Sequence, residues 1–535
     1  MQVRNKLRQS VKKAVKNLQE KGKFPVGSFV NIKIERPQRE GQGDYATSIA
    51  MQIASHAGRK PKTIAKILAE ELKTNEFVAK IFEDTLVAPP GFINFYFKKE
   101  YLGKFLSDLS KDEKLGVLNL GKDKKINFEF ISVNPTGELH VGHGRGAFYG
   151  DVLARILSFV GFKVVREYYI NNARQSAQIK ELGKTALGRG TSYKSPYLDE
   201  KLHQYAKALR RTKSPESAGY FLAGKIQNDI EKFLAKKAKI KFDIWTEEEE
   251  LYKKNKIEKV LNELKDMNLT YEKDGATWLD NKKHGDNQDQ VLIRQNGEST
   301  YFLADIAYHI YKTERNADKL IDIWGADHQG HVKRIMVALG VFGIKDVEIL
   351  ITQLVRLKGK LKLSKRKGNA VSLEDLIDDI GIDAARYFYL TKSLNTQMEI
   401  DLKLAREQSQ KNPVFYIQYT HARICSILRK SRGTTTKLKT NSKILAELKD
   451  GGELNLVKKL LMFPDIIEDI AQDYQIHRLT GYLHELAQEF NKFYTEFRVI
   501  ENDKINMARL ALVTTAGLVI KRSLDILGIS APKKM

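Results

Sequence analysis

Cysteine is nearly absent from this sequence, since Cys425 is the only one among 535 residues. A single thiol excludes an internal disulfide framework and any zinc site built from several thiolates. Long apolar runs are also missing, because no stretch approaches the roughly 20 apolar residues of a membrane-spanning helix. The opening stretch MQVRNKLRQSVKKAVKNLQEKG lacks the continuous apolar segment of a secretory signal, so we predict a cytoplasmic location.

Acidic residues are fewer than basic ones: the chain has 66 Asp and Glu against 91 Lys and Arg, which gives a formal net charge of +25. An excess of this size fits a polyanionic partner, and nucleic acid is the leading candidate. A lysine-rich surface that is merely solvated would have the same composition. Charge alone therefore leaves both interpretations open.

The chain is too long for one hydrophobic core and has no internal repeat, so we predict about three domains. Residues 1–112 are predicted to form a small α/β module. In residues 113–403 strand-like and helix-like segments alternate, which predicts a doubly wound parallel sheet. A polar, lysine-rich helical insertion is expected near residues 178–241. Residues 404–535 carry apolar residues at three- and four-residue spacing throughout, which predicts a helical bundle.

The stretch NPTGELHVGHGRGAFYGD, residues 134–151, joins a predicted strand to a predicted helix. Before it, KINFEFIS alternates apolar and polar residues as a strand does, and a proline and a glycine then end the strand. Beyond it, apolar residues recur on one helical face as far as Gly161: Phe148, Val152, Ile156 and Val160. His140 and His143 are therefore predicted at the N-terminus of a helix, at the carboxyl edge of a parallel sheet.

Such a turn is suited to anions, because free backbone N–H groups and the positive end of the helix dipole face the same place. Gly142, Gly144 and Gly146 would let a phosphate-bearing ligand approach the backbone, and the two imidazoles would add donors. A His-x-x-His pair can also be half of a metal site, although helical i, i+4 spacing and a nearby third ligand are missing here. Histidines with a purely structural role are the other alternative.

A second motif, RLKGKLKLSKRKGNAVSLEDL, lies about two hundred residues downstream. Seven of the thirteen residues 356–368 are Lys or Arg, so a solvated basic loop is one interpretation. Within it, Lys362-Leu-Ser-Lys365 resembles the lysine loop that accompanies the His-x-Gly-His turn in class I aminoacyl-tRNA synthetases, with Leu363 where methionine is commonest. Two such motifs in this order point to an ATP site.

The whole chain resembles the arginyl-tRNA synthetases. The resemblance rests on a combination of strings that spans all three predicted domains: GDYATSIA, PPGFINF, FEFISVNPTGELHVGHGR, STYFLADIAYH, WGADHQGH, NPVFYIQYTHAR and LDILGISAPKKM. It implies a Rossmann-like catalytic domain with a helical insertion, an N-terminal module that contacts the D-loop of tRNA, and a C-terminal helical anticodon-binding domain. The implied activity is arginine–tRNA ligation through an arginyl-adenylate, with arginine, ATP and tRNA as substrates, Mg²⁺ as cofactor, and activation that requires bound tRNA.

The resemblance also implies two groups of arginine-binding residues. The guanidinium is a planar cation with five donors, so its pocket needs acceptors and negative charge. The family positions for this pocket match Glu248, Tyr301 and Asp305, and Tyr301 and Asp305 lie at i, i+4 on one helical face. Glu248 belongs to a run of four glutamates, so its register could slip by one. The residues implied to hold the amino acid's backbone groups are Glu129, Ser132, Asn134 and Gln329.

For ATP, the implied catalytic residues are His140, His143, Lys362 and Lys365. Gly142 and the two lysines would contact the phosphates, while Gly325 and Asp327 would border the ribose. An ordinary strand-end turn is the alternative for the last two. The carboxylate of arginine would attack the α-phosphorus and displace pyrophosphate, which requires positioning and charge neutralisation more than a covalent nucleophile.

One segment departs from the family pattern: EYYINNARQ carries Asn172 and Arg174 where relatives usually have Asp and Gly. Three other functions share parts of this pattern. A nucleotidylyltransferase shares the histidine turn but does not need the appended helical domain, and a catalytically silent tRNA-binding relative would not need both ATP motifs. A class I synthetase for another amino acid is the third, and the single cysteine argues against the cysteine enzyme with its thiolate-rich zinc site.

Overall fold

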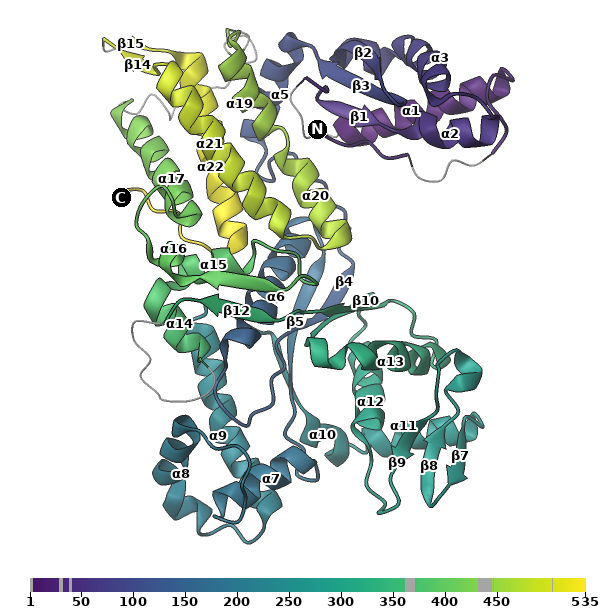
Figure 1. Cartoon of the computed structure of the whole chain (residues 1–535), viewed down its shortest axis with the longest axis vertical. Coiled ribbons are helices and arrows are strands. Elements are labelled where there is room, and N and C mark those ends of the chain that lie inside the picture. The colour runs from purple at the N-terminus through teal and green to yellow at the C-terminus, as the bar shows by residue number, and fades with distance from the viewer. Residues whose placement is uncertain are drawn as a thin grey trace.

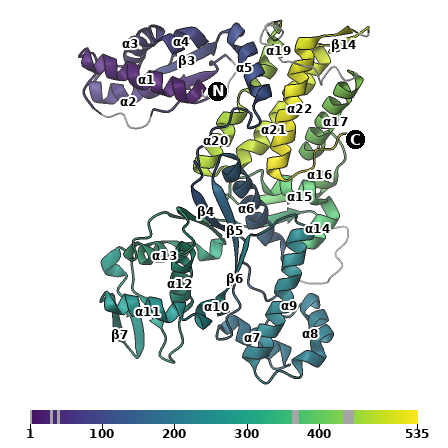
Figure 2. The same cartoon turned by 180° about the vertical axis from the view of Figure 1, so that it is seen from behind.

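The computed structural model describes residues 3–27, 32–37, 41–360, 371–431, 445, 447–502 and 504–535. The molecule is elongated, with an N-terminal module and a group of C-terminal helices at one end and a parallel sheet in the middle (Figure 1). Two smaller parts extend from the sheet at the other end. The view from behind shows the same order (Figure 2).

The N-terminal module is an antiparallel sheet packed against helices. Its strands have the order β1-β3-β2. The first helix forms where apolar residues recur every three or four positions, and this face is buried. The predicted small α/β module is confirmed. Its elements are α1 (Val3–Glu20), β1 (Tyr45–Thr47), α2 (Ile49–Ala57), α3 (Pro61–Lys73), α4 (Glu76–Ile81), β2 (Phe82–Ala88), β3 (Phe92–Phe97) and α5 (Lys99–Lys111).

The central sheet has five parallel strands in the order β11-β10-β4-β5-β6. These strands are β4 (Lys125–Glu129), β5 (Lys163–Ile170), β6 (Ile244–Glu247), β10 (Lys319–Trp324) and β11 (Val347–Ile351). From β4 the chain continues to β5 and β6 on one side, and later to β10 and β11 on the other. Strand order therefore reverses between β4 and β10, and ligands of open α/β sheets bind at the carboxyl edge of such a point.

Three helices lie between β5 and β6: α7 (Ala177–Ala186), α8 (Pro196–Leu209) and α9 (Pro215–Lys236). Serine N-caps and prolines in the first turn explain where α8 and α9 begin. Residues 178–241 are all described and contain no strand. The predicted helical insertion is therefore confirmed, and it forms one of the two outlying parts in Figure 1.

The second outlying part differs from the simple strand–helix alternation that the sequence predicted. After α10 (Glu248–Lys253) and α11 (Lys256–Asp266), an antiparallel sheet forms from β7 (Thr270–Lys273), β8 (Ala276–Leu279) and β9 (Gln290–Ile293). Asp274 and Gly275 connect β7 to β8, and both have positive φ, as a two-residue hairpin turn requires. The Asp-Gly pair was a hairpin signal, but the strands beside it are short and polar.

A short helical turn, η1 (Lys282–His284), lies between β8 and β9. The elements that follow the sheet are α12 (Tyr301–Thr313), η2 (Ala326–His328), α13 (Gln329–Val341), β12 (Val355–Lys358), α14 (Leu373–Ile380), α15 (Ile382–Tyr389), β13 (Met398–Asp401) and α16 (Leu402–Arg406). β12 and β13 pair in parallel and lead toward the C-terminal helices. A separate hydrophobic core lies under α11, α12 and α13, apart from the large core of the molecule.

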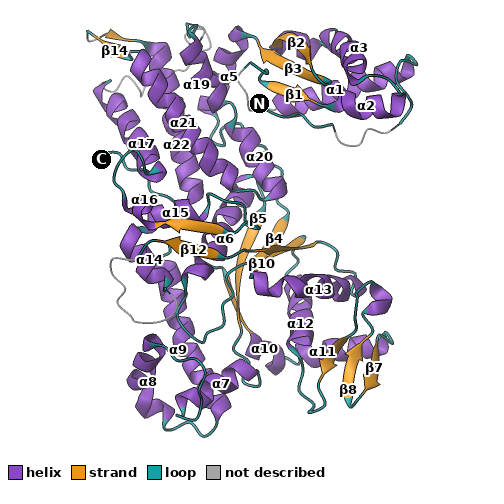
Figure 3. Ribbon diagram, viewed as in Figure 1, coloured by secondary structure: helices purple, strands orange, loops and turns teal. Residues whose placement is uncertain are grey.

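The C-terminal part is almost entirely helical (Figure 3). It consists of α17 (Pro413–Lys430), α19 (Gly451–Leu460), α20 (Phe463–Asp473), α21 (His477–Glu496), the short pair β14 (Ile500–Glu501) and β15 (Lys504–Ile505), and α22 (Met507–Leu527). α17, α21 and α22 pack on one another, so the predicted helical bundle is confirmed. Across the described ranges, the search for a helix of membrane-spanning length and apolarity found none.

Candidate active site

The turn between β4 and α6 (Val141–Phe159) places both histidines at the start of the helix, as predicted. His140 is the N-cap residue, and its Nδ1 accepts the Gly142 N–H at 3.1 Å. The Nδ1 of His143 accepts the His140 N–H at 3.1 Å. The two rings stack with their centroids 3.5 Å apart. Two imidazoles are therefore fixed to the first turn of the helix by its own free N–H groups.

Both histidines favour the neutral form more than a free imidazole does. Burial lowers the pKa of His140, and burial together with the neighbouring His140 lowers the pKa of His143 to about 3. Since each Nδ1 accepts a backbone N–H, the single proton of each ring is on Nε2. Each ring thus offers an Nε2–H donor and no free ring lone pair, which suits an anion and disfavours the reading as a metal pair.

The glycines of this turn have different surroundings. A Cβ on Gly142 would lie 2.8 Å from Cε1 of His140, so its absence lets the His140 ring fold over the first turn. A Cβ on Gly144 would lie 2.7 Å from the Tyr389 hydroxyl and 2.8 Å from Leu373. Gly144 therefore makes room for the protein itself, and the expectation that it admits a ligand to the backbone is wrong.

Lys362 and Lys365 of the lysine motif lie outside the described residues, so only the residues on either side of them can be described. On the far side of the motif, Val371 O accepts the Val141 N–H at 3.1 Å, and the Leu373 N–H donates to Leu139 O at 2.8 Å. The Tyr389 hydroxyl donates to Val141 O at 2.6 Å. The residues that follow the lysine motif in the chain, Val371 and Leu373, are thus bonded to the histidine turn.

Three predicted residues follow β10, the neighbour of β4 at the reversal point. Gly325 ends the strand, Asp327 lies in η2, and Gln329 begins α13. The side chains of Asp327 and Gln329 are exposed, and Asp327 lies 3.4 Å from Nε2 of His328. These residues share the carboxyl edge of the sheet with the histidine turn.

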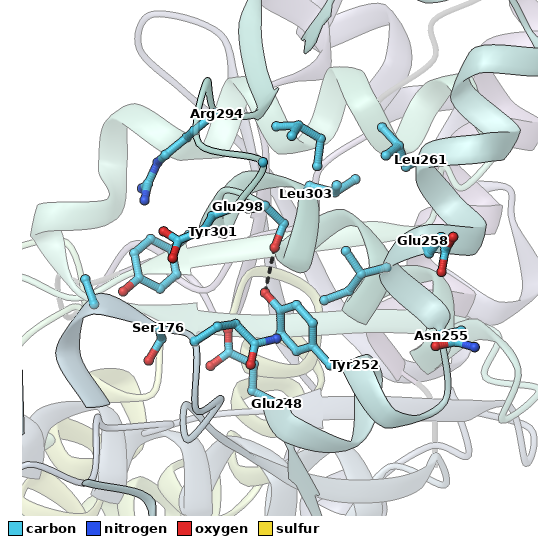
Figure 4. Close-up of a pocket in the computed structure, with 16 residues that line it drawn as sticks. Ser176, Glu248, Tyr252, Asn255, Glu258, Leu261, Arg294, Glu298, Tyr301 and Leu303 are labelled. Atoms are coloured by element: carbon cyan, nitrogen blue, oxygen red, sulfur yellow. Dashed lines mark hydrogen bonds between the residues drawn. The ribbon is translucent and has the colours of Figure 1, made fainter. Parts of the chain in front are cut away.

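A cavity of about 470 Å³ lies beside this edge (Figure 4). Glu248 and Tyr252 contribute from α10, and Tyr301 and Leu303 from α12. Tyr252 is hydrogen-bonded to Ser299 at 2.9 Å. Of the residues predicted for the guanidinium pocket, Glu248 and Tyr301 line this cavity. Glu247 and Glu249 do not, which favours Glu248 as the register of the glutamate run.

Glu248 and Asp305 are carboxylates whose pKa values are both raised. Burial, reinforced by the charge of Asp305, raises the pKa of Glu248 to about 7, although the Ala173 N–H donates to it at 3.2 Å. Burial also raises the pKa of Asp305 to about 7. Within the described residues neither carboxylate forms an ion pair, and buried charges are normally paired. A cation from outside would stabilise both.

Tyr169, on β5, was not found from the sequence. Its hydroxyl is buried and has no hydrogen-bond partner among the described residues. Burial raises its pKa, and so does the negative charge of Glu248 and Asp305. Its ring stacks on Tyr308 at 3.9 Å between centroids. In the sequence it is one of two adjacent tyrosines in a strand of mixed polar and apolar residues, and such a pattern gives no functional signal.

Glu129, Ser132 and Asn134 lie at or just beyond the end of β4, as predicted. Glu129 is buried and accepts from Lys312 Nζ at 2.8 Å, and Lys312 also pairs with Asp322 at 2.7 Å. Ser132 Oγ accepts the Tyr169 N–H at 3.1 Å. Ser132 has a φ of 38°, a left-handed conformation that is uncommon for a residue with a side chain. Asn134 is exposed.

Family comparisons match nearly the whole chain. The family described as tRNA synthetases class I (R), catalytic domain, matches residues 105–178 and 197–406. The arginyl tRNA synthetase N terminal domain matches residues 4–97, and the DALR anticodon binding domain matches residues 417–535. Together with the parallel sheet and the histidine turn at its reversal point, these matches define a class I aminoacyl-tRNA synthetase.

Individual relatives show to which family within this class the chain belongs. An arginine–tRNA ligase of Listeria monocytogenes is 39% identical over 534 residues, 94% of each chain, and arginine–tRNA ligase 1 of Halalkalibacterium halodurans is 38% identical over 100% of this chain and 99% of its own. This chain belongs to the arginyl-tRNA synthetase family. The solved arginyl-tRNA synthetases of Thermus thermophilus (22% identity, TM-score 0.78, 99% and 100% coverage) and Plasmodium falciparum (19%, 0.81, 100% and 99%) share its fold.

Proposed function

We propose that this protein attaches arginine to its cognate tRNA by way of an arginyl-adenylate. The observation that supports this most directly is a pair of carboxylates in a class I synthetase: the buried Glu248, which lines the cavity, and the half-buried Asp305. Within the described residues neither of them forms an ion pair. The curated relatives, which carry the name arginine–tRNA ligase over almost the whole chain, support the same assignment.

The guanidinium of arginine would lie between Glu248 and Asp305, with Tyr301 at the side of the cavity. A planar fork of N–H donors matches carboxylate oxygens, and such charge-assisted hydrogen bonds are about twice as strong as neutral ones. An uncharged side chain would leave both carboxylates buried and unpaired. The pocket can therefore discriminate strongly without an editing step.

The backbone groups of arginine would be held at the end of β4. Glu129 has one carboxylate oxygen on Lys312, and its other oxygen can accept from the α-ammonium group. Ser132 and Asn134 follow it, and Gln329 approaches from the start of α13. We assign these four residues to orienting the α-carboxylate toward ATP.

The triphosphate of ATP would lie at the N-terminus of α6, against Gly142 and the Nε2–H donors of His140 and His143. Neutral donors can strengthen their hydrogen bonds as charge moves onto the phosphates in the transition state. Gly325 and Asp327 would border the ribose. Lys362 and Lys365 are proposed to neutralise the β- and γ-phosphates.

Mg²⁺ fits this site as an ion bound mainly by phosphate oxygens. Over the described residues, a search for groups of three or more His, Cys, Asp or Glu able to hold a metal found none. Mg²⁺ usually keeps several waters and binds substrate phosphates with one or two carboxylates, so a protein cage is unnecessary. It would supply charge neutralisation, while the residues above position the α-phosphorus for in-line attack by the arginine carboxylate.

In the second step a terminal ribose hydroxyl of tRNA, the 2′-OH in this class, would attack the adenylate. We assign the N-terminal module to contact with the D-loop and the C-terminal helices to the anticodon arm, with domain boundaries near residues 112 and 403. The net charge of +25 fits this polyanionic partner. The cytoplasmic location stays a prediction from the sequence.

ATP–pyrophosphate exchange measured with each of the twenty amino acids, with and without tRNA, tests the proposal. Arginine is the only one of the twenty amino acids for which we expect exchange. Exchange with another amino acid would move the protein to a different class I specificity. The absence of exchange with any amino acid, in the presence of ATP, Mg²⁺ and arginine tRNA, would rule out a synthetase activity.

A further inference from the structure

The glutamate run at the start of α10 is held by three consecutive residues of the turn after β5. The Asn172 amide donates to Glu247 Oε2 at 3.1 Å. The Ala173 N–H donates to Glu248 Oε2 at 3.2 Å, and the Arg174 N–H donates to Glu249 Oε2 at 3.0 Å. Each residue of the turn thus meets one glutamate, in order.

Further contacts fix Glu247 and Glu249, the two glutamates on either side of Glu248. Asn172 Oδ1 accepts the Glu249 N–H at 3.3 Å, and Arg174 Nε lies 3.3 Å from Glu249 Oε1. Tyr220, on helix α9 of the insertion, donates from its hydroxyl to Glu247 Oε2 at 3.1 Å. The Arg174 guanidinium lies over the same tyrosine ring, 4.4 Å from its centroid. The carboxylates on both sides of Glu248 are therefore occupied, and Glu248 is the member of the run that lines the cavity.

We propose that Asn172 and Arg174 are positioning residues that hold the glutamate run in register. As a result, Glu248 is the only glutamate of the run that presents its carboxylate to arginine. The proposal rests on the function proposed above and adds to it. The side-chain identities matter: an aspartate at 172 would bring two carboxylates to about 3 Å from each other, and a glycine at 174 would leave the buried Glu249 without a cation. The two departures from the family pattern thus have a common structural reason, because both side chains contact the same glutamate run.

The positioning also has an electrostatic side. Glu248 faces Asp305 from α12, Glu249 from its own helix, and the hydroxyls of Tyr169 and Tyr252. The negative charges of Asp305 and Glu249 both raise the pKa of Glu248. The Arg174 guanidinium, paired with Glu249, offsets part of that effect. Loss of this cation would make Glu248 harder to ionise, and arginine needs the ionised form.

Exchanging the hydrogen-bond donor and acceptor between positions 172 and 247 tests whether this contact sets the register of the glutamate run. Asn172→Asp should raise the KM for arginine on the order of tenfold at pH 7 and leave the KM for ATP nearly unchanged, because it removes the donor to Glu247 and adds repulsion. Asn172→Asp combined with Glu247→Gln restores a donor between the two side chains, and we expect the KM to return to within about threefold of the parent protein. An unchanged KM in the single variant, or no recovery in the double variant, would overturn the proposal.

A second pair of variants tests the charge and does not depend on how Asn172→Asp folds. Arg174→Gln should move the midpoint of the arginine KM against pH upward by roughly half a unit or more, and Arg174→Lys should restore it. Lys184→Gln is the matched control, since Lys184 is a half-exposed cation of α7 paired with Glu181, and we expect no shift. An equal midpoint in the parent protein and Arg174→Gln would contradict the electrostatic role.

The failure of this proposal and that of the proposed function are distinguishable. If the protein does not activate arginine, the parent protein itself shows no arginine-dependent exchange. If only the positioning role is wrong, the parent protein is active and the Asn172 and Arg174 variants match it. Thermal unfolding of each variant separates a general loss of folding, which would lower kcat for every substrate, from a selective change in arginine KM.

Discussion

At the scale of single residues, the unusual feature of the site is two carboxyl groups that titrate near neutrality. Glu248 and Asp305 both have a pKa of about 7, raised first by burial and then by neighbouring negative charge. A bound guanidinium favours the ionised forms and so lowers both pKa values. Arginine binding is therefore coupled to proton release when the pH is below about 7.

This coupling predicts a pH dependence for arginine binding. The KM for arginine should fall as the pH rises from 6 to 8 and level off once both groups are ionised, while the KM for ATP changes little. Asp305→Asn should raise the arginine KM at pH 7 by roughly ten- to a hundredfold, the loss of a charged hydrogen bond of about 1.5–3 kcal/mol, and should make the profile less steep. Steady-state exchange kinetics across this pH range measure both effects, and a flat profile in the parent protein would contradict the assignment.

The sequence could predict which residue types form the site but not how they are oriented. His140 and His143 stood out because two histidines among glycines follow a strand. Their Nε2 protons follow from two backbone hydrogen bonds that the sequence does not reveal. Likewise Tyr169 stands out only through its buried hydroxyl, which has no hydrogen-bond partner in the described part of the chain and faces residues far along the sequence.

At the scale of elements, α6 is the helix to which we assign the phosphate site, and one of its glycines, Gly144, is closely packed. Gly144 packs against Tyr389 and Leu373, and the Tyr389 hydroxyl in turn bonds Val141 O in the first turn of α6. Gly146 lies on the same helix, but a Cβ there would have its nearest neighbours at 3.8 and 3.9 Å. The two positions therefore form a matched pair for substitution.

Gly144→Ala should destabilise the protein by about 1–3 kcal/mol, because Tyr389 and Leu373 are fully packed and must move. It should also raise the KM for ATP more than that for arginine, since Tyr389 fixes the turn that holds the histidines. Gly146→Ala should be neutral or stabilise by up to about 1 kcal/mol through helix propensity. Thermal unfolding and the two KM values measure these effects, and equal behaviour of the two variants would refute the packing argument.

The sequence predicted helices and strands correctly where apolar residues recur at a constant spacing over many residues. The strand before the histidine turn and the helix after it follow a clear pattern, and Gly161, with a φ of 93°, lies just beyond the helix as expected. The sheet β7-β8-β9 was missed because each strand has four residues and β7 is largely exposed. Short polar strands carry too little alternation to be recognised.

At the scale of the whole molecule, a buried ion pair connects parts that are distant in sequence. Arg386, on α15, pairs with Asp151 of α6 at 2.8 Å, and both side chains are fully buried. Arg386 also donates to Ala238 O, at the end of the helical insertion, and to Leu527 O, at the end of α22. One side chain thus joins α6, the insertion and the C-terminal helices.

The N-terminal module is attached to the C-terminal helices by charge. Arg4 of α1 pairs with Asp469 of α20 at 2.5 Å, and Arg36 pairs with Asp465 at 2.7 Å. The Arg36 contact is buried, and Tyr45 lies next to it. These contacts position the N-terminal module relative to the helices that we assign to tRNA binding. The sequence predicted the three parts but not this interface, since residues more than four hundred positions apart supply it.

These connections offer a route by which tRNA could control activation. The chain runs from the lysine motif through Val371–Leu373, bonded to the histidine turn, into α14, α15 and then the C-terminal helices. A ligand shifts such an arrangement only if it binds the active form more tightly than the resting form. We therefore expect arginine-dependent pyrophosphate exchange to be near background without tRNA and to appear when arginine tRNA is added, even if its terminal ribose has been oxidised so that it cannot be charged. A tRNA for another amino acid is the control and should not restore exchange. Full exchange in the absence of RNA would show that the active site is already assembled, and that tRNA acts in this protein as a substrate alone.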